Sequence, residues 1–382
     1  MIYLDNNATT RLDPRVLEAM MPFLTDEYAN AASTHPFGLR AHEAVKLARQ
    51  QVSQLIGCEP QELIFTSGAT EAINLSIKGV VDSYASRGKH IVTVQTEHSA
   101  VLDVCRYLET QGCEVTYLPV QPDGLLDLTV VQQAIRPDTI LVSVMLVNNE
   151  TGVIQPIQEI AALAHAAGTL FMTDATQAVG KMPIDVEALG IDLLTCSGHK
   201  LYGPKGVGAL YVRQRKPRRV KLEALLHGGG HERGWRSGTL NVPGIVGLGQ
   251  AAELCRQSMN EEAIRIGTLR DELEVMLLAI SGTRVNGNRE YRLYNTTNIL
   301  FENCDSDAMI MGLEGIAVSN GSACTAASVD PSHVLLAMGL NETEAFSCLR
   351  FSLGRFTKPE DLSHLLRTII DLINQLRSYI MA

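Results

Sequence analysis

Short apolar segments alternate with segments of helical periodicity through the middle of the chain. Strands that alternate with helices form a mostly parallel sheet with helices on both faces. We therefore expect an α/β fold built on such a sheet. The predicted strands are 90–93, 114–118, 139–147, 170–173, 193–196 and 208–212, and the predicted helices between them are 100–111, 129–136 and 157–167.

Further elements flank this alternation on both sides. Helical periodicity predicts helices at 14–24 and 40–56, and a predicted strand at 62–66 leads into a helix that extends to Tyr84. After Val242 the pattern changes to that of a smaller α+β unit. Its predicted helices are 261–280, 305–313 and 359–380, and its predicted strands are 298–302 and 349–353.

The length and composition allow more than one hydrophobic core. The chain has 382 residues, of which 46% are hydrophobic and 19% charged, as in an ordinary globular protein. We expect a large domain of residues 15–256 and a small α+β domain made of residues 1–14 and 257–382.

The charge balance excludes one class of function. The formal net charge of −10 argues against a nucleic-acid-binding surface, which would need accumulated lysine and arginine. The basic run at residues 213–221 is the exception. It is either a solvated connection or a docking site for an acidic partner.

The sequence carries no targeting or metal signal. Residues 1–10 contain no cationic, apolar leader, and no apolar run approaches the roughly eighteen residues that cross a bilayer. The eight cysteines are scattered without a Cys-x-x-Cys pair, so we expect no disulfide and no zinc site. His227 and His231 enclose three glycines, which favours a loop near a dimer contact over a metal site. We expect a cytoplasmic protein without a metal and without a membrane partner.

Polar side chains follow four of the predicted strands at the point where each strand ends. Ligands of such sheets bind beyond the carboxyl ends of the strands. Four polar clusters at one sheet edge therefore predict a ligand site there. They are Thr96-Glu97-His98, Asn148-Asn149-Glu150, Thr173 to Gln177, and Ser197-Gly198-His199-Lys200.

Lys200 is the candidate nucleophile of this site. Taken alone, a lysine in a glycine-rich turn is most often exposed to solvent. Here small residues precede it, and Gly203-Pro204 stops a helix from continuing behind it. Such packing could hold the amine in a polar cleft, lower its pKa and let it form a Schiff base with an aldehyde cofactor.

The aldehyde cofactor pyridoxal phosphate (PLP) makes further demands on the chain. It needs a carboxylate beside its ring nitrogen, an anion site for its phosphate and a group against its ring face. Asp174 could supply the carboxylate and His98 the ring contact. The helix start at residues 67–71 offers free backbone N–H groups to a phosphate. Each of these residues alone is more often structural.

The motifs of this edge, taken together with two others, resemble a known family. They are Tyr3 to Thr10, Thr96 to His98, Asn148 to Gly152, Asp174-x-x-Gln177, Ser197 to Lys200 and, most specifically, Ser319 to Thr325 around Cys324. They resemble the PLP-dependent cysteine desulfurases of the NifS/IscS type, in the class V aminotransferase group of fold-type I enzymes. The resemblance covers nearly the whole chain.

The resemblance implies a PLP site on the large domain. Lys200 would hold the cofactor covalently, Asp174 would pair with the ring nitrogen and His98 would stack on the ring. Gln177 would bind the ring oxygen. The other implied cofactor contacts are Ala69, Thr70, Asn149, Ser197 and His199, and Thr239 would reach the phosphate of the neighbouring subunit in a homodimer.

The implied substrate is L-cysteine. Asn149 and Arg350 would bind its carboxylate. An arginine inside the apolar strand 349–353 also needs an anionic partner, and its planar fork suits a carboxylate.

The implied reaction converts L-cysteine to L-alanine and leaves a persulfide on Cys324. Lys200, His98 and Cys324 would be the catalytic residues. The neighbours of Cys324 are small or hydroxyl residues, which suits a mobile loop on the small domain. The loop would carry sulfur to an acceptor protein such as an iron–sulfur scaffold.

Two other functions stay open. An aminotransferase or β-lyase of the same fold, including a selenocysteine lyase, would use PLP without needing Cys324. A catalytically idle member would bind sulfur-pathway proteins and hold no covalent cofactor.

Overall fold

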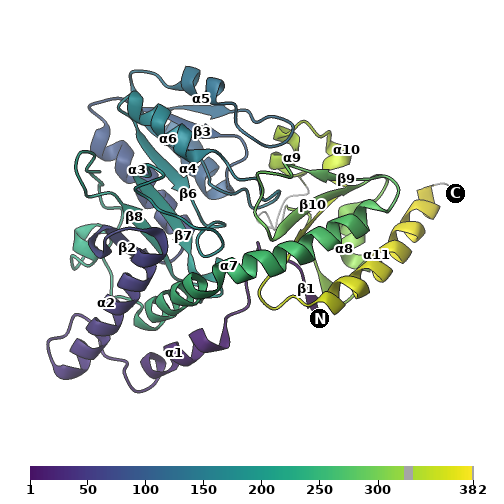
Figure 1. Ribbon diagram of the computed structural model, residues 1–382. Helices are drawn as coiled ribbons and strands as arrows, with labels where there is room; N and C mark the ends of the chain where they lie inside the picture. The colour runs from purple at the N-terminus through teal and green to yellow at the C-terminus, as the bar shows by residue number, and fades with distance from the viewer. Residues whose placement is uncertain (322–329, 381–382) are drawn as a thin grey trace.

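The computed structural model describes residues 1–321 and 330–380, and its two larger sheets are joined by one long helix, α7 (Val242–Leu278). A seven-stranded sheet with flanking helices forms the larger part, and a three-stranded sheet lies beside it (Figure 1). This arrangement confirms the predicted α/β fold with a mostly parallel sheet and a smaller α+β unit.

The large sheet has the strand order β2-β8-β7-β6-β5-β3-β4. Its neighbouring strands are parallel, except that β8 is antiparallel to both β2 and β7. The strand predicted at 139–147 ends at Ser143, because the chain then leaves the ladder and Val147 pairs with Ile154. The strands are β2 (Leu63–Thr66), β3 (His90–Val94), β4 (Glu114–Leu118), β5 (Thr139–Ser143), β6 (Leu170–Asp174), β7 (Leu193–Ser197) and β8 (Gly208–Val212).

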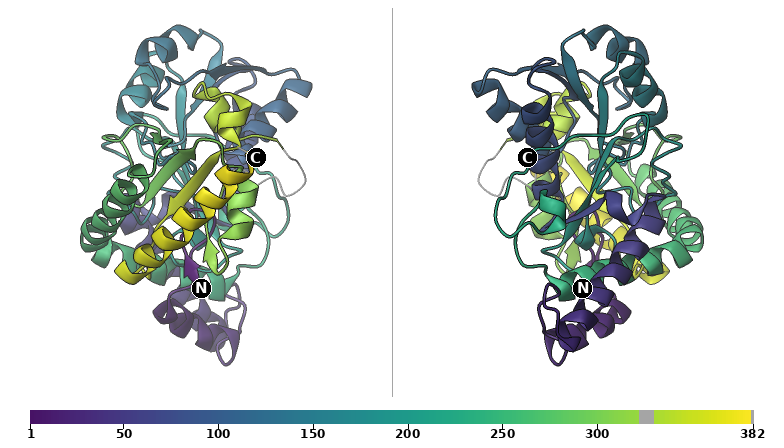
Figure 2. Two further views of the ribbon diagram at one scale, coloured as in Figure 1. Left: turned by 90° about the vertical axis from the view of Figure 1, so that its right-hand side faces the viewer. Right: turned by 90° about the vertical axis from the view of Figure 1, so that its left-hand side faces the viewer.

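The small unit is built on an antiparallel sheet with the order β12-β10-β9. The N-terminal strand β1 (Ile2–Tyr3) lies with this unit, where it pairs in parallel with β11 (Ile316–Ala317). Figure 2 shows α11 lying along this side of the molecule. The remaining elements are β9 (Thr283–Asn286), β10 (Thr296–Phe301), α8 (Ser306–Gly312), α9 (His333–Ala337), α10 (Glu342–Ala345), β12 (Cys348–Ser352) and α11 (Pro359–Ile380).

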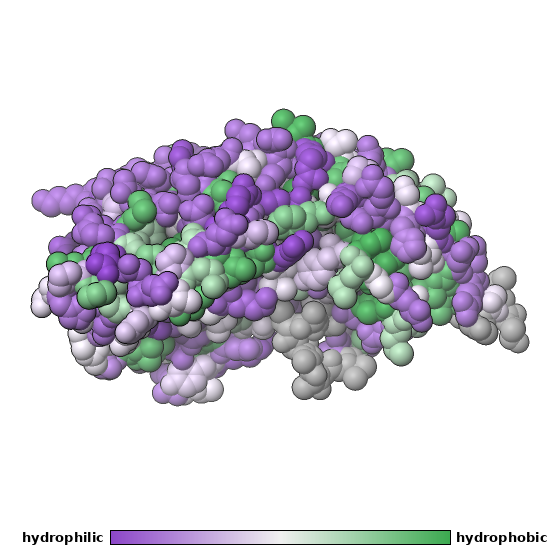
Figure 3. All heavy atoms as spheres, turned by 90° about the horizontal axis from the view of Figure 1, so that it is seen from below, coloured by the Kyte–Doolittle hydropathy of each residue, from purple (hydrophilic) through white to green (hydrophobic). Residues whose placement is uncertain are grey.

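Helix α1 (Pro14–Leu24) has apolar residues on two sides. Val16 and Met20 are buried in the core that includes the start of α7. Leu17, Met21 and Leu24 share a second face at helical spacing and are exposed. Hydrophobic patches are also visible among polar residues on the face seen from below in Figure 3.

Successive residues of each strand in the large sheet pack on opposite faces. Leu193 belongs to the core on one face and Leu194 to the core on the other, as the two-residue period of a strand requires. Both faces are buried, which explains the nearly continuous apolar sequence of these strands. One face carries α3 (Ala69–Tyr84) and α4 (Ser99–Thr110), and the other carries α2 (Pro36–Ile56), α5 (Leu128–Ala134) and α6 (Ile157–Ala166).

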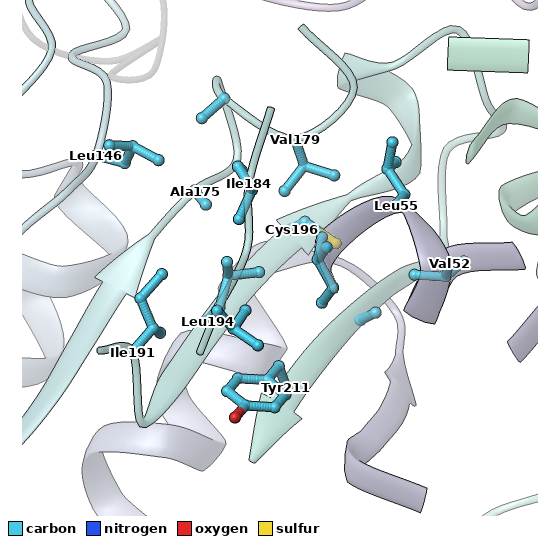
Figure 4. Packing of buried hydrophobic residues seen from close by; sticks show 14 of the residues in the cluster. Val52, Leu55, Leu146, Ala175, Val179, Ile184, Ile191, Leu194, Cys196 and Tyr211 are labelled. Carbon is cyan, nitrogen blue, oxygen red and sulfur yellow. The ribbon is translucent and has the colours of Figure 1, made fainter. Parts of the chain in front are cut away.

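Figure 4 shows at close range part of the core between the large sheet and the face that carries α2, α5 and α6. Leu194 and Cys196 of β7 and Tyr211 of β8 belong to the same buried cluster as Val52 and Leu55 of α2. This packing holds the end of β7, and the residues that follow it, in a fixed place.

Helix α7 begins at Val242, whereas the sequence pattern predicted a start near residue 261. Glycines in its first turns lower the helical signal. Two of them are required by packing, because a Cβ atom at Gly249 would lie 2.5 Å from the Ala48 Cα, and one at Gly247 would lie 2.6 Å from the Met20 Sδ.

The two halves of α7 lie in different cores. The half before Met259 packs with the large sheet, and the half after Ile266 packs with the small one. The predicted domain boundary at residue 256 therefore lies within this helix, and the division into domains stays a prediction.

Three arginines of the basic run 213–221 form ion pairs within the chain. Arg213, Arg215 and Arg218 pair, in that order, with Glu187, Glu62 and Asp192. The pairing favours a structural role for these arginines over an open docking surface.

Three further findings concern the described residues. No helix among them is both long and apolar enough to cross a membrane. They contain no group of three or more His, Cys, Asp or Glu side chains that could hold a metal ion. Their seven cysteines are free thiols.

Candidate active site

A cavity of about 520 Å³ lies where β3, β6 and β7 end. Thr239 is exposed and does not line it. Cys324 lies outside the described residues. The other predicted site residues all line this cavity: Ala69, Thr70, His98, Asn149, Asp174, Gln177, Ser197, His199, Lys200 and Arg350.

Lys200 reaches the cavity from a tight turn behind β7. The turn at Gly198–Lys200 requires a glycine first, because a Cβ atom at Gly198 would lie 2.9 Å from the Pro204 carbonyl oxygen. The Nζ atom donates hydrogen bonds to the carbonyl oxygens of Asn7, at 2.5 Å, and Ala8, at 2.7 Å. The amine is therefore held against the N-terminal segment at the cavity wall.

This N-terminal segment forms one wall of the site, and sequence reasoning assigned it no role. The Asn7 carbonyl accepts hydrogen bonds from Lys200 and Gln177. The Asn7 Nδ2 donates to the Asn149 carbonyl at 3.0 Å and to the Thr296 hydroxyl at 2.9 Å. The available signal was the polar run directly after β1, because polar residues at a strand end often contact ligands.

Asp174 presents one carboxylate oxygen to the cavity. Its Oδ1 accepts hydrogen bonds from the Thr176 backbone N–H at 2.9 Å, from the Thr176 hydroxyl, and from the Thr195 hydroxyl at 3.3 Å. Its Oδ2 accepts none from the residues that the structure describes, although the residue is only 5% exposed. A buried carboxylate in this state fits a ligand with a cationic N–H group.

The start of helix α3 offers an anion site at one end of the cavity. Gly68 precedes the helix without a side-chain cap, so no capping side chain occupies the first backbone N–H groups. Ser197 lies opposite, with its Oγ 3.6 Å from the place of a Gly68 Cβ. Burial, and then the charge of Lys200, lower the pKa of His199 to about 4, so this imidazole is neutral at pH 7. A helix N-terminus with hydroxyl and imidazole neighbours fits a phosphate.

His98 caps helix α4 and faces the cavity. Its Nδ1 accepts a hydrogen bond from the Ala100 backbone N–H at 3.0 Å, which fixes the ring plane. The carbonyl oxygen of the preceding residue, Glu97, accepts a hydrogen bond from His333 Nε2 at 2.9 Å. The strand end that carries His98 is thus held from both parts of the molecule.

Arg350 lies on β12 and reaches the cavity from the small unit. Its Nη2 forms an ion pair with Asp5 at 2.6 Å, and its Nη1 donates to the Asn149 carbonyl at 3.0 Å. The chain therefore supplies an anionic partner itself, so burial alone was not evidence for a bound carboxylate. The Arg350 Nε is buried without a hydrogen-bond partner among the described residues.

Glu97 is a fully buried carboxyl group next to His98. Its Oε1 accepts from the Met145 backbone N–H at 2.5 Å, and its Oε2 has no partner in the described part of the chain. Burial, and then the charge of Asp174, raise the pKa of Glu97 well above its ordinary value. The folded state therefore favours the protonated, neutral side chain.

We expect Glu97→Gln to gain stability relative to the unmodified protein as the pH rises. The folded protein holds a proton on Glu97 that the unfolded chain releases near its ordinary pKa of about 4.3. Stability is therefore lost as the pH rises from there toward the folded pKa, by up to about 1.4 kcal/mol per pH unit. Glutamine does not titrate, so urea unfolding from about pH 5 to pH 7 should show a growing advantage of the variant.

The control for this prediction is Glu43→Gln. The Glu43 side chain is 66% exposed on α2, and its replacement should change stability by an amount independent of pH. If the change in stability caused by Glu97→Gln is also independent of pH, Glu97 is not protonated in the folded protein.

Together these groups can hold an aldehyde-bearing aromatic ring that carries a phosphate. The helix start and Ser197 suit the phosphate, Asp174 Oδ2 suits a protonated ring nitrogen, and Lys200 suits the aldehyde. The cavity has the size of a small-molecule site.

Known proteins match this chain along nearly its whole length. The model of the family described as aminotransferase class-V matches residues 2–365. The cysteine desulfurase IscS of Anaeromyxobacter dehalogenans strain 2CP-C is 53% identical over 378 residues, which cover 98% of this chain and 93% of that protein.

Solved structures match it as well. A NifS-like protein has a TM-score of 0.91 at 38% identity and covers 98% of this chain and 99% of its own. A protein described as SspA in complex with cysteine has a TM-score of 0.82 at 39% identity, and the match covers 94% of this chain and 100% of that one.

Proposed function

Because this chain belongs to the class-V aminotransferases and, among them, to the cysteine desulfurases of the NifS/IscS type, we propose that it is a PLP-dependent cysteine desulfurase. It converts L-cysteine to L-alanine and leaves the sulfur on Cys324 as a persulfide, from which iron–sulfur cluster assembly or another acceptor is supplied. One observation carries the proposal: a chain 53% identical to a cysteine desulfurase combines Lys200, Asp174 and Arg350 in one cavity.

The polar groups of the cavity support PLP as the cofactor. Asp174 would keep the ring nitrogen protonated through its Oδ2, and His98 would lie against the ring. Helix α3, Ser197 and the neutral His199 would bind the phosphate. When bound, PLP supplies an electron sink for the charge that develops at the substrate α carbon.

Lys200 is the residue that binds the aldehyde and moves the proton. Its Nζ takes the α proton of the substrate. The carbonyl oxygens of Asn7 and Ala8 then accept the hydrogens of the protonated amine, which stabilises it at the cavity wall.

Arg350 and Asn149 would hold the substrate carboxylate. Asp5 fixes the Arg350 guanidinium through Nη2 and the Asn149 carbonyl fixes it through Nη1, and both Arg350 and Asn149 line the cavity. A charge-assisted contact of this kind orients an amino acid by its carboxylate.

The other cysteines are poor candidates for the sulfur acceptor. Burial raises the pKa of all seven described thiols above the ordinary value. Thiolates, not thiols, attack sulfur. Gly321, three residues before Cys324 in the sequence, lines the cavity. These observations support Cys324 as the acceptor.

The test is a single assay on the purified, PLP-loaded protein. L-cysteine labelled in its sulfur is added, and both alanine and protein-bound label are measured. The proposal requires alanine and a label that a reductant releases from the peptide containing Cys324. Pyruvate and free sulfide without protein-bound sulfur would instead indicate a β-lyase.

We further propose that the protein acts as a homodimer in the cytoplasm. Thr70 and Thr239 are both exposed in the single chain, which suits a phosphate site completed by Thr239 of a second subunit. The exposed face of α1, with Leu17, Met21 and Leu24, is an apolar surface suited to such a contact. Seven free thiols suit a reducing compartment.

Met21→Glu should weaken the dimer. In the proposed dimer, a charge would replace the apolar Met21 side chain, which is 45% exposed in the single chain. Full burial of such a side chain is worth roughly 1.5–3 kcal/mol, so covering its exposed part should matter enough that the dissociation constant rises on the order of tenfold. Sedimentation equilibrium measures this change. Met311→Glu, on the 82% exposed Met311 of α8, is the control and should leave the dimer intact. A monomeric unmodified protein would refute the homodimer.

A further inference from the structure

Lys181 is a buried lysine that the proposed reaction leaves without a role. It is 3% exposed, and among the described residues its Nζ makes one hydrogen bond, to Gln177 Oε1 at 2.9 Å. No carboxylate there forms an ion pair with it. A buried ammonium without an anionic partner is costly, so its retention needs a reason.

A tight turn brings Lys181 beside Gln177. Gly180 has a φ of +81°, which favours glycine, and a Cβ atom there would lie 3.0 Å from both the Cys255 Sγ and the Leu201 Cβ. Lys181 follows Gln177 by four residues, and the turn points its side chain back to the carboxamide.

The two partners of Gln177 fix the orientation of its carboxamide. The carboxamide has one oxygen and one nitrogen, and its oxygen accepts the hydrogen bond from Lys181 Nζ at 2.9 Å. A carbonyl oxygen only accepts, so the atom that faces the Asn7 carbonyl, at 2.9 Å, must be the nitrogen. Asn7 also accepts from Lys200, so the Gln177 Nε2 lies beside the reactive amine.

We propose that Lys181 is a positioning residue for the bound cofactor: its ammonium locks the Gln177 carboxamide with Nε2 at the cavity and sets a positive charge behind the ring oxygen that Gln177 contacts. The inference rests on the proposed PLP chemistry. Lys181 would affect the orientation and charge of the bound ring, whereas the proposed function is the conversion of L-cysteine to L-alanine.

The charges around Lys181 support this role. The groups that face it are Lys200 and Arg350, which are cationic, and the Cys255 thiol. Burial, and then the charge of Lys200, lower the pKa of Lys181 to about 7. The anionic ring oxygen of a bound cofactor is the partner that would restore the charged form of Lys181.

The decisive readout is the visible absorption of bound PLP as a function of pH. A positive charge near the nitrogen that joins Lys200 to the cofactor disfavours its protonation. Removing that charge in Lys181→Met should therefore raise the pH midpoint of the absorption change by about one unit. The dissociation constant for PLP should rise about tenfold.

Two further measurements separate positioning from a purely structural role. Methionine replaces a buried charge with an apolar side chain of similar length, so the thermal unfolding temperature of the cofactor-free variant should not fall. In a Gln177→Leu background, Lys181→Met should shift the midpoint less than in the unmodified protein. Lys46→Met, at a side chain 69% exposed on α2, should shift nothing.

The outcomes separate this inference from the proposed function. An unshifted midpoint in Lys181→Met, with alanine still formed by the unmodified protein, overturns the inference and leaves the function standing. A shifted midpoint without alanine formation supports the role of Lys181 and overturns the proposed function. If Lys181→Met does not fold, Lys181→Gln keeps a donor to Gln177 without the charge, and its midpoint must still rise. No visible absorption with PLP in the unmodified protein overturns both.

Discussion

Lys200→Ala is expected to lower the formation of alanine from L-cysteine by about 10³-fold. In the proposed mechanism the amine both binds the aldehyde and moves the α proton, so one substitution would remove two functions. Alanine formation under saturating PLP and L-cysteine measures the effect. Borohydride should fix PLP to Lys200 of the unmodified protein and leave no covalent adduct at this position of the variant, as mass spectrometry would show.

The loss should be one of chemistry and not of folding. The Asn7 and Ala8 carbonyl oxygens that accept from Lys200 line an open cavity, so water can replace the amine as their partner. The unfolding temperature should therefore change little. Lys46→Ala, on an exposed lysine of α2, is the control and should keep full activity. Alanine formed at the normal rate by Lys200→Ala would refute the proposed role of this amine.

Cys324→Ser is expected to lower alanine formation on the order of 10²-fold or more and to abolish protein-bound sulfur. A serine hydroxyl remains protonated at neutral pH and does not attack the substrate sulfur. The visible absorption of bound PLP should be unchanged, because the proposed cofactor contacts lie on the large sheet. Alanine assay, persulfide labelling and the absorption spectrum of one preparation give all three results.

The matched control for this prediction is Cys58→Ser. Cys58 is half-buried, and burial raises the pKa of its thiol to about 12, so it carries almost no thiolate at neutral pH. The substitution should leave alanine formation and labelling as they are. Normal alanine formation by Cys324→Ser would refute the proposed role of Cys324 as the sulfur acceptor.

Much of the fold follows from the sequence because burial repeats along each element. Strands such as β7 are apolar on both faces, and helices such as α4 show one buried stripe, so local periodicity locates both. The predicted start of α7 was wrong because Gly247 and Gly249 weaken the helical pattern. These glycines allow close contacts with α1 and α2. Helix propensity depends on neighbouring residues in the sequence, whereas those contacts join residues that are far apart in it.

The candidate site follows from the sequence in part, for a related reason. The polar clusters after the strands must meet at one sheet edge, so Asp174, His98 and Lys200 were expected together. Asp5 as the partner of Arg350 was not, because the two residues stand at opposite ends of the chain. The acceptors of Lys200 on Asn7 and Ala8 are backbone atoms, which no residue pattern reveals.

The α/β alternation, the sheet edge that carries the candidate site and the family of the chain can all be predicted from the sequence alone. Which distant groups pair at that edge depends on the folded chain: Asp5 pairs with Arg350, and the carbonyl oxygens of Asn7 and Ala8 accept from Lys200. These partners are far apart in the sequence. Periodicity records how one element meets the core, whereas a hydrogen bond between distant segments depends on how whole elements are packed.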